Sequence, residues 1–454
     1  MTFDVDKHDT LRMIRDAITG TEFAGRVFVA GGFVRDFVMG RQSKDIDLVV
    51  NLPQGGICLA TLLKEKCGAT DLHLFERFGT AQVVLNGEDI EMVMTRAETY
   101  TEGSRNPEVE FADLKADVMR RDFTINTLLI DLMNGEILDI LGYAIGDINR
   151  GMLHVTTDAD IVFNDDPLRM LRAVRFVSQL NFRLSSATRF GIIRNVNKIS
   201  FISKERIRDE FMKLLVGVNV VSALCLLVET GLINSILPEM RNMIGVDHGK
   251  YHIKDPFEHT LDVVSRVAES GDQVLILAAL LHDLGKPSTI SFSDDGAHFY
   301  NHETKSAQIA REFLLRLKFP NDVVEDVVMM VANHMAFASS MEKPSAKHVR
   351  RVVRIFGDRD KFNRFMKLVG ADMKPNPRVI RRDFSIIEEV FAILKRDDEA
   401  KVPVRAPVSG HDVMDTFGIP SGPEVGRLLS VANEAFLENP NLTKDELLAV
   451  MRGA

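Results

Sequence analysis

The stretch AGGFVRDFVMGRQSKDIDLVV, residues 30–50, contains the pattern that decides the fold of the first part of this chain. It predicts a strand over residues 26–30, a glycine turn, a short helix over residues 34–39 and a second strand over residues 45–50. A strand, a glycine turn and a helix in this order place backbone amides at the end of a sheet.

The glycine turn suits a phosphate group. Glycines leave no Cβ between backbone and ligand, so the amides of Gly31 and Gly32 can approach a phosphate closely. The helix behind them adds partial positive charge at its N-terminus, and Arg35 adds a full charge with forked donors.

The second strand carries two carboxylates on one face. Asp45 and Asp47 are two residues apart, and the apolar residues between and after them face the other way, toward a core. Hard cations prefer oxygen ligands, so a phosphate cradle beside two carboxylates predicts a triphosphate bound with Mg²⁺. A surface turn with solvated aspartates is the alternative.

A third carboxylate follows in a predicted hairpin. Residues 81–85 and 90–95 predict two strands joined by an Asn-Gly turn. Glu91 lies on the polar face of the second strand, where it can join Asp45 and Asp47; an ordinary exposed strand residue would show the same pattern. Residues 96–113 are polar and rich in turn formers, and they predict a mobile loop.

The segment RRDFTIN, residues 120–126, supplies further polar groups. Beside a metal–triphosphate site, Arg121 would neutralise charge, and Asp122 and Asn126 would contact ribose hydroxyls. A structural Arg–Asp pair is the alternative for each of these residues.

The segment DDPLRMLRAVRF, residues 165–176, predicts a helix capped by Asp165 or Asp166. A polar stripe repeats along it every third residue, which is typical of a solvated face or a salt-bridge ladder. The stripe consists of Asp166, Arg169, Arg172 and Arg175.

The first pair of this stripe also matches a base-reading site. Cytosine and adenine each present an exocyclic amine beside a ring-nitrogen acceptor, whereas uracil and guanine present a carbonyl beside a ring N–H. Asp166 as acceptor and Arg169 as donor would therefore accept C and A and reject U and G. Arg172 and Arg175 would remain for phosphate or packing roles.

Histidines and aspartates recur at the edges of apolar helices in the second half of the chain. A vicinal His-Asp with remote ligands can bind one or two divalent metal ions, whereas a single histidine in such a place usually belongs to a core. The candidates are His259, His282, Asp283, His302, His334 and Asp372.

The composition is that of a globular protein with several domains: 454 residues, 45% of them hydrophobic. We expect no membrane segment, because no apolar run reaches spanning length. Three cysteines at unrelated spacings predict free thiols and a reducing cytoplasm. The net charge of −9 excludes a global attraction to nucleic acid, so RNA contacts require a local basic surface.

Several motifs resemble one known family. GGFVRD with DID, RRDFTIN, DDPLRMLRAVRF and SKERIRDEF occur in the order of the class II tRNA nucleotidyltransferase and poly(A) polymerase family. FEHT, LLHDLGKP, NHETKSA, NHM and GAD resemble the HD domain that many bacterial members carry. The resemblance covers essentially the whole chain.

The resemblance implies an α+β fold in four parts. A nucleotidyltransferase head with a small mixed β-sheet would span residues 1–150, followed by an all-α neck over 151–240 that recognises the base. An HD-containing helical body would span 241–395, and a helical, tRNA-binding tail 396–454. Oligomeric state is not predicted.

The resemblance also implies residue roles. Asp45 and Asp47 match magnesium ligands, and Glu91 would help to deprotonate the attacking hydroxyl. The expected nucleotide-binding set is Gly31, Gly32, Arg35, Arg121, Asp122, Asn126, Asp166, Arg169, Arg172 and Arg175. The HD domain implies a divalent transition metal on His259, His282, Asp283 and Asp372, with His302 and His334 as further candidates.

Two motifs depart from the family pattern. Asp165 stands where a glutamate is usual, which spares the two base readers but shortens a supporting contact. The glycine-aspartate motif after the head is loose, with Asp139, Gly142 and Asp147 but Leu141 in place of Phe or Gly.

The implied function is addition of CCA to the 3′ end of tRNA from CTP and ATP, with release of pyrophosphate, accompanied by HD phosphohydrolase activity. The alternatives are CC-only addition, A-only addition, a poly(A) polymerase, an HD phosphohydrolase as main activity, and a non-catalytic RNA-binding protein. Residues 96–113 favour full CCA addition, because CC-only relatives tend to lack part of this loop. The tail is not basic, unlike that of poly(A) polymerases.

Overall fold

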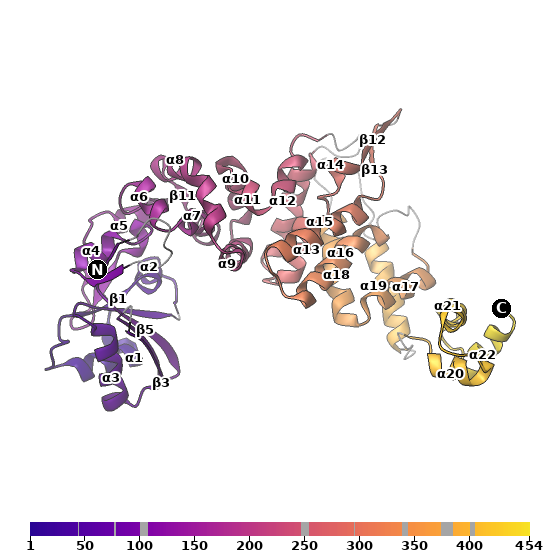
Figure 1. Cartoon of the computed structure of the whole chain (residues 1–454), viewed down its shortest axis with the longest axis horizontal. Helices are drawn as coiled ribbons and strands as arrows, with labels where there is room; N and C mark the ends of the chain where they lie inside the picture. Colours follow the sequence, from indigo (N-terminus) through magenta and orange to yellow (C-terminus); the bar gives the residue numbers. More distant parts are fainter. Residues whose placement is uncertain are drawn as a thin grey trace. The chain divides into compact units, whose positions relative to one another are not determined.

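The computed structural model describes residues 1–43, 45–76, 79–99, 108–246, 254–294, 296–337, 344–373, 385–399 and 405–454. The chain divides into two compact units, Met1–Ile236 and Leu237–Ala454 (Figure 1). The first unit contains a mixed sheet, and the second is mainly helical, which confirms the predicted α+β class.

A seven-stranded sheet with the order β3-β4-β5-β2-β1-β8-β9 forms the centre of the first unit. Its strands are β1 (Val27–Ala30), β2 (Ile46–Val50), β3 (Thr70–Phe75), β4 (Thr80–Leu85), β5 (Glu88–Met94), β8 (Leu129–Asp131) and β9 (Ile137–Leu138). β2 and β5 run parallel, and the other neighbours are antiparallel. Strands that are distant in sequence therefore lie side by side at the centre of the sheet.

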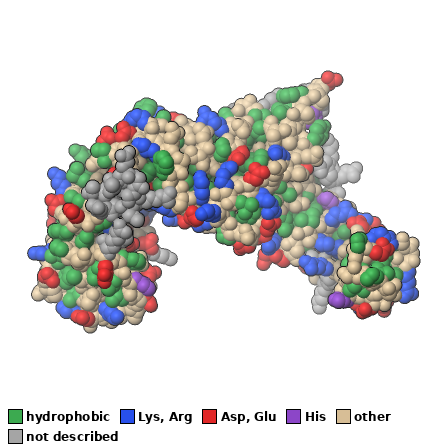
Figure 2. Space-filling view, in the orientation of Figure 1, with side chains coloured by type: hydrophobic (Ala, Val, Ile, Leu, Met, Phe, Trp, Pro, Cys, Tyr) green, Lys and Arg blue, Asp and Glu red, His purple; other side chains and the backbone are tan. Residues whose placement is uncertain are grey.

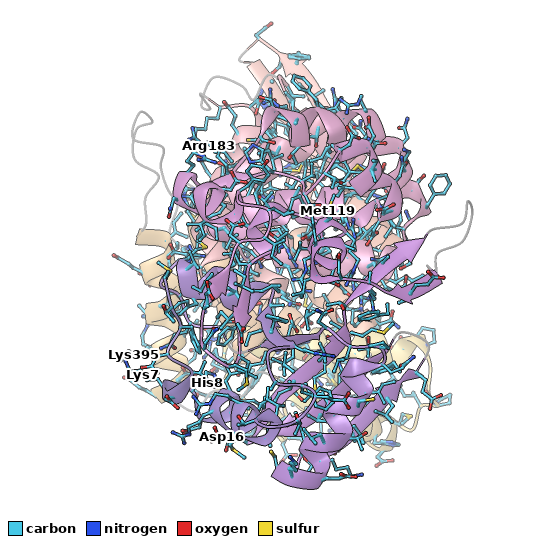
Figure 3. The ribbon with its side chains drawn as sticks, turned by 90° about the vertical axis from the view of Figure 1, so that its left-hand side faces the viewer. Lys7, His8, Asp16, Met119, Arg183 and Lys395 are labelled. Carbon is cyan, nitrogen blue, oxygen red and sulfur yellow. The ribbon has the colours of Figure 1, made fainter. Side chains whose placement is uncertain are left out.

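One face of this sheet is covered over its central strands. The side chains of Ile46, Leu48 and Val50 are buried on it, as the alternation in β2 predicts. Helix α3 (Gly55–Cys67) packs against β4 and β5, and α1 (Asp9–Ile18) packs on α3. Lys7, His8 and Asp16, which precede or belong to α1, lie at the surface in Figure 3.

The opposite face is divided. A small core of Phe28, Ala30, Val49, Val118 and Leu129 covers part of it, and α4 (Leu114–Met119) contributes to this core. The end of the sheet beyond this core carries polar side chains instead. Helix α2 (Gly32–Val38) begins directly after the glycine turn, two residues earlier than predicted.

The structure tests two expectations for the middle of the first unit. The hairpin of β4 and β5 turns at Asn86 and Gly87, which have φ values of 54° and 77°, as an Asn-Gly turn requires. The prediction of an irregular loop over residues 96–113 is wrong at both ends, because β6 (Arg96–Thr99) and β7 (Glu108–Phe111) pair as antiparallel strands. Residues 100–107 lie outside the described residues.

The rest of the first unit is helical apart from one short parallel pair, β10 (Met152–Leu153) with β11 (Arg183–Leu184). Its other elements are the 3₁₀ helices η1 (Val5–Lys7), η3 (Thr124–Asn126) and η4 (Val196–Phe201), and α5 (Ala144–Arg150), α6 (Ala159–Asp165), α7 (Leu168–Leu180), α8 (Ser186–Asn195), α9 (Lys204–Leu215), α10 (Val220–Thr230) and α11 (Ile233–Ile236). α7 packs between α9 and α10.

The structure decides between the two residues predicted to cap α7. Asp165 does not cap this helix, since it is the last residue of α6. The carboxylate of Asp166 accepts a hydrogen bond from the Leu168 amide at 3.0 Å, so Asp166 is the residue that satisfies the helix start.

The second unit packs helices around an apolar α13, with α12, α16 and α18 as neighbours. Its elements are η5 (Pro238–Met243), α12 (Pro256–Ala268), α13 (Gln273–Leu281), α14 (Lys286–Thr289), β12 (Ile290–Ser293), β13 (Gly296–Phe299), α15 (His302–Arg316), α16 (Asn321–Asn333), η6 (His334–Phe337), α17 (Ala346–Phe356), α18 (Arg359–Met373), α19 (Ser385–Glu399), α20 (Gly410–Phe417), α21 (Pro423–Glu438) and α22 (Lys444–Arg452). The C-terminal helices α20 to α22 share a small core, and α21 contacts α17.

Charged side chains of both signs are interspersed over the face shown in Figure 2. Among the described residues, no helix combines the length and the apolar character that a membrane crossing needs.

Candidate active site and metal centre

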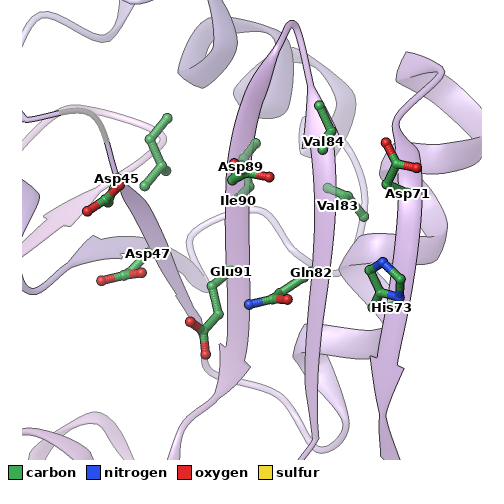
Figure 4. A pocket seen from close by; sticks show the side chains of 11 residues that line it. Asp45, Asp47, Asp71, His73, Gln82, Val83, Val84, Asp89, Ile90 and Glu91 are labelled. Atoms are coloured by element: carbon green, nitrogen blue, oxygen red, sulfur yellow. The ribbon is translucent and has the colours of Figure 1, made fainter. Parts of the chain in front are cut away.

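The predicted carboxylates meet on the polar end of the sheet. Parallel pairing of β2 with β5 sets Asp47 directly beside Glu91, and Asp45 precedes β2 on the same face (Figure 4). They line an open hollow of about 710 Å³, whose other lining residues include Asp71, His73, Gln82 and Asp89. The structure therefore brings the three predicted acids together.

Among the described residues, negative charge outweighs positive charge around this group of acids. Loss of hydration raises the pKa of Asp47 to about 6, although its side chain remains in contact with solvent, and the charges of Glu91 and Asp45 act in the same direction. Arg121 is close enough to oppose the shift. Converging carboxylates with unbalanced negative charge fit a hard divalent cation such as Mg²⁺.

The glycine turn lies against the same carboxylates. Gly31 has a φ of +68°, in the left-handed region that favours glycine. A Cβ at this position would lie 3.3 Å from Oδ2 of Asp47. Ala30 pairs with Asp47 across β1 and β2, which fixes the turn beside the acids. Gly31 is thus required both by its backbone conformation and by the closeness of Asp47.

A polar network extends from α2 into the segment 122–126. Arg35 donates to Oδ1 of Asn126 at 2.9 Å, and Asn126 donates to Oδ1 of Asp122 at 2.9 Å. The same Asp122 accepts two hydrogen bonds from Arg172 on α7, at 2.6 and 2.9 Å. Although burial acts against it, Arg172 lowers the pKa of Asp122, so this carboxylate is ionised.

The network continues to α9. Arg175 pairs with Glu210 at 3.1 Å, and Arg172 lies 3.8 Å from the same carboxylate. Burial and the neighbouring charge of Arg172 lower the pKa of Arg175 to about 10. The guanidinium of Arg175 is thus held among other cations as well as beside Glu210. Five predicted nucleotide-binding residues, Arg35, Asp122, Asn126, Arg172 and Arg175, therefore form one connected group.

Arg121 is positioned by a residue that sequence reasoning missed. Asp117 is completely buried and binds Arg120 at 2.7 Å and Arg121 at 2.9 Å. Although burial acts against it, the charges of the two arginines lower the pKa of Asp117. Arg121 also donates to the Asn126 carbonyl at 3.0 Å. Asp117 precedes the two arginines by three and four residues, a helical spacing that could have revealed this pairing.

Asp166 and Arg169 have separate partners at the start of α7. Asp166 accepts from Arg206 at 2.8 Å, while Arg169 donates to the Arg120 carbonyl at 2.9 Å. Arg169 also lies 3.9 Å from Asp165. Arg206 belongs to the SKERIRDEF motif, and its ion pair with Asp166 was not foreseen. The base-reading role of Asp166 and Arg169 stays a prediction.

A second group of functional side chains lies in the second unit. Nε2 of His259 is 2.8 Å from Asp372, and Nε2 of His282 is 3.2 Å from Asp283. His302 and His334 join them: their Nε2 atoms are 3.1 Å apart and lie 3.4 and 3.7 Å from Asp283. The structure thus brings all six predicted ligands into one histidine–aspartate cluster.

The cluster divides into two sets of ligands. Within each set, the ligand atoms all lie within 4.8 Å of one another. One set is His259, His282 and Asp372, and the other is Asp283, His302 and His334. Nδ1 of His282, His302 and His334 each contacts a backbone carbonyl at 2.7 to 2.9 Å, which directs the Nε2 atoms inward.

The chemistry of the cluster fits divalent metal. Nε2 of His282 and both carboxylate oxygens of Asp283 are buried without a hydrogen bond of acceptable geometry. Burial, together with the charge of His282, lowers the pKa of His334 to about 4, which keeps this imidazole neutral and able to bind metal. Lys286 forms an ion pair with Asp283 at 2.7 Å.

Comparison with known proteins supports one family. Three family models match: the poly A polymerase head domain over residues 27–154, the probable RNA and SrmB-binding site of polymerase A over 181–244, and the HD domain over 257–375. The chain is 29% identical over 434 residues to the CC-adding tRNA nucleotidyltransferase of Thermus thermophilus, covering 93% of this chain and 92% of the relative. It is 29% identical over 424 residues to the A-adding tRNA nucleotidyltransferase of Deinococcus radiodurans, covering 90% of each.

Solved structures share the fold. The Bacillus stearothermophilus CCA-adding enzyme in complex with CTP superposes with a TM-score of 0.70 at 23% identity, over 98% of this chain and 97% of that one. The Thermotoga maritima CCA-adding enzyme complexed with tRNA superposes with a TM-score of 0.60 at 19% identity, over 100% of this chain and 96% of that one.

Proposed function

Since the chain belongs to the class II tRNA nucleotidyltransferase and poly(A) polymerase family, we propose that it adds CCA to the 3′ end of tRNA from CTP and ATP. The observation that carries this proposal is the meeting of Asp45, Asp47 and Glu91 beside Gly31, with the network of Arg35 and Arg172 behind the turn. The proposed setting is the reducing cytoplasm, in which the three free cysteines would stay reduced.

In the proposed reaction the terminal ribose oxygen attacks the α-phosphorus of CTP or ATP, and the bond to pyrophosphate breaks. Asp45 and Asp47 would hold Mg²⁺, which when bound offsets the negative charge of the triphosphate. Glu91 would accept the proton of the attacking hydroxyl. Arg35 and Arg121 would bind phosphate oxygens, and Asp166 with Arg169 would select cytosine or adenine.

Replacement of either metal-binding aspartate tests the proposal. We expect Asp45→Ala and Asp47→Ala to lower incorporation of labelled CTP and ATP by about 10³-fold, because each removes a charge that acts in the transition state. Asp71→Ala is the matched control, since Asp71 lines the same hollow outside the carboxylate trio. Incorporation by the Asp47→Ala variant at the wild-type rate would contradict the assignment.

The choice among CCA, CC-only and A-only addition needs its own assay, since the two relatives named above carry CC-adding and A-adding names. We expect CTP to extend a tRNA that ends before CCA by two nucleotides, and ATP then to complete it. Failure with the first tRNA but success with one ending in CC would indicate A-only addition. Growth of a long A tail would indicate a poly(A) polymerase.

We propose phosphohydrolysis as a second activity, on the observation that six metal-binding side chains converge in the second unit. These two sets of side chains would hold divalent metal, which when bound would activate water for hydrolysis of a phosphate ester such as a 2′,3′-cyclic phosphate. We expect His282→Ala to lose this hydrolysis and to keep tRNA extension, and Asp47→Ala to do the reverse. A His282→Ala variant that hydrolyses the cyclic phosphate as well as wild type would refute the second activity alone.

A further inference from the structure

The ring of Phe176, on α7, lies among three arginines of the polar network described above. Its side chain is buried, with 4% exposure. The guanidinium carbons of Arg175, Arg35 and Arg172 lie 4.4, 5.3 and 5.6 Å from the ring centroid. All three distances are within the ~6 Å over which the negative face of an aromatic ring attracts a cation. We name these three residues the arginine cluster.

The arginine cluster brings together groups from distant parts of the first unit. Arg35 comes from α2 beside the glycine turn, whereas Arg172 and Arg175 come from α7 itself. The edge of Phe123 packs against the same ring, with centroids 5.7 Å apart and planes at 85°. Phe176 therefore belongs to the helix that carries Arg169 and contacts Phe123, in the segment that carries Asp122 and Asn126.

Three guanidinium groups this close together repel one another. Their contacts with carboxylates do not by themselves explain why they are held together. Asp122 contacts Arg172, and Glu210 contacts Arg175 most closely, while Arg35 pairs with Asp36 at 2.8 Å. Each guanidinium thus has a different acid partner, and the acids lie on different elements. The Phe176 ring lies within 6 Å of all three guanidinium carbons.

We propose that Phe176 is a positioning residue for nucleotide binding, whose ring holds the arginine cluster in the arrangement that receives the triphosphate. The inference rests on the proposed nucleotidyl transfer and names a residue that acts through Arg35, Arg172 and Arg175. An aromatic ring stabilises a cation without neutralising it, so the three guanidiniums keep their positive charge for an anionic ligand.

Replacement by leucine removes the ring face and keeps an apolar side chain. We expect Phe176→Leu to raise KM for both CTP and ATP by about 3- to 10-fold, as the loss of one or more cation–π contacts implies. The KM for tRNA and the ratio of CTP to ATP use should stay unchanged. Phe176→Tyr retains the ring and should restore the KM. Phe182→Leu is the matched control, since Phe182 is buried in the same unit near Gly151.

Leucine also changes packing, so a second series separates packing from electrostatics. Phenylalanine with one, two or three ring fluorines at position 176 keeps the shape while the ring face becomes progressively less negative. We expect KM for CTP to rise stepwise with fluorine number while the melting temperature stays nearly constant. A KM that is independent of fluorine number would overturn the proposal. Wild-type protein that incorporates no nucleotide would instead refute the proposed function.

Discussion

At the scale of single residues, the aspartates of the site differ in how far neighbouring positive charges balance them. Asp47 lies among acids and has a raised pKa, whereas Asp117 and Asp122 are buried beside arginines and have lowered pKa values. The first acid is therefore suited to a cation from solution, and the other two hold arginines of the chain. These opposite roles lead to different expectations for stability.

Substitution of Asp47 should stabilise the metal-free protein above pH 6. The folded-state pKa of about 6 exceeds the usual ~3.9, so the stabilising contribution of the protonated form is lost as pH rises through 6. Asp47→Asn removes this loss and, because the side chain is exposed, should add about 1 kcal/mol or less at pH 7.5. Urea unfolding in chelator should show the difference at pH 7.5 and no difference at pH 4. Equal stability at pH 7.5 would contradict the charge imbalance.

Substitution of Asp117 should have the opposite effect. Asp117→Asn leaves Arg120 and Arg121 without their buried charge partner and should cost about 3 kcal/mol of unfolding free energy, as well as raising KM for the nucleotides. Asp160→Asn is the control, since Asp160 pairs with Arg194 at the surface, where solvent screens the pair, and should leave stability nearly unchanged. A neutral Asp117→Asn would show that Arg121 does not depend on this pair.

The sequence predicts the position of a side chain correctly where the alternation of a β-strand fixes the face on which it lies. Asp45, Asp47 and Glu91 were placed on one face because the β-strand alternates. Asp117 was missed because its function depends on burial, which the sequence does not display. The motif that contains Phe176 indicates no role for it, because its contact with Arg35 on α2 joins residues that are far apart in the sequence.

At the scale of elements, the turn between β1 and α2 determines how closely a ligand can approach. Gly31 has a left-handed φ and lies against Asp47, and Gly40, which follows α2, has nearly the same φ of +69° but open space around it. Both glycines have a positive φ, but Gly31 combines it with a ψ of −134° and has Asp47 as a close neighbour. Gly40→Ala therefore serves as the control for a positive φ without a nearby side chain.

We expect Gly31→Ala to lose more stability than Gly40→Ala, because Gly31 combines its φ of 68° with a ψ of −134°, a backbone conformation that side chains rarely adopt. Only Gly31→Ala should lower kcat/KM, by about 100-fold, since its Cβ would displace Asp47. Thermal unfolding and nucleotide incorporation measure the two effects. Equal activity losses in the two variants would indicate that the positive φ alone matters.

Element boundaries were predicted well in β2, β4 and β5 and less well where pairing is distant. The strands β6 and β7 are short and carry mainly polar residues, so a sequence reading favoured a loop, although backbone pairing stabilises them. Asp165 or Asp166 was predicted to cap α7; Asp166 does so, and Asp165 ends α6, because α7 begins at Leu168 after an extended Asp166. The parallel pairing of β2 with β5 could not be derived from local pattern, as β3 and β4 lie between them in the chain.

At the scale of the whole molecule, the two units carry separate chemistry. The carboxylate trio and the arginine network lie in Met1–Ile236, and the histidine–aspartate cluster lies in Leu237–Ala454. A chain of this kind need not unfold in a single step. Metal should therefore act on each unit separately.

We expect calorimetry to show two unfolding transitions and Mn²⁺ to raise both of them, the shift of the one that belongs to Leu237–Ala454 being due to the histidine–aspartate cluster. At 100 times its dissociation constant, a metal ion bound only to the folded state adds about 2.7 kcal/mol. His282→Ala should abolish the shift of that transition, and Gly31→Ala should leave it intact and lower the other transition. A Mn²⁺ shift of the Leu237–Ala454 transition that persists in His282→Ala would exclude the cluster as the site.

The strand order also determines when this protein can become active. Glu91 reaches Asp47 only after β3 and β4 have been made and β5 has paired with β2, a contact between residues far apart in the chain. Such distant pairings form late, because the intervening chain must first close. A growing or partly refolded chain thus holds its aspartates without their glutamate partner. Recovery of nucleotide incorporation after dilution from denaturant would therefore follow completion of the sheet, and not the earlier appearance of helices.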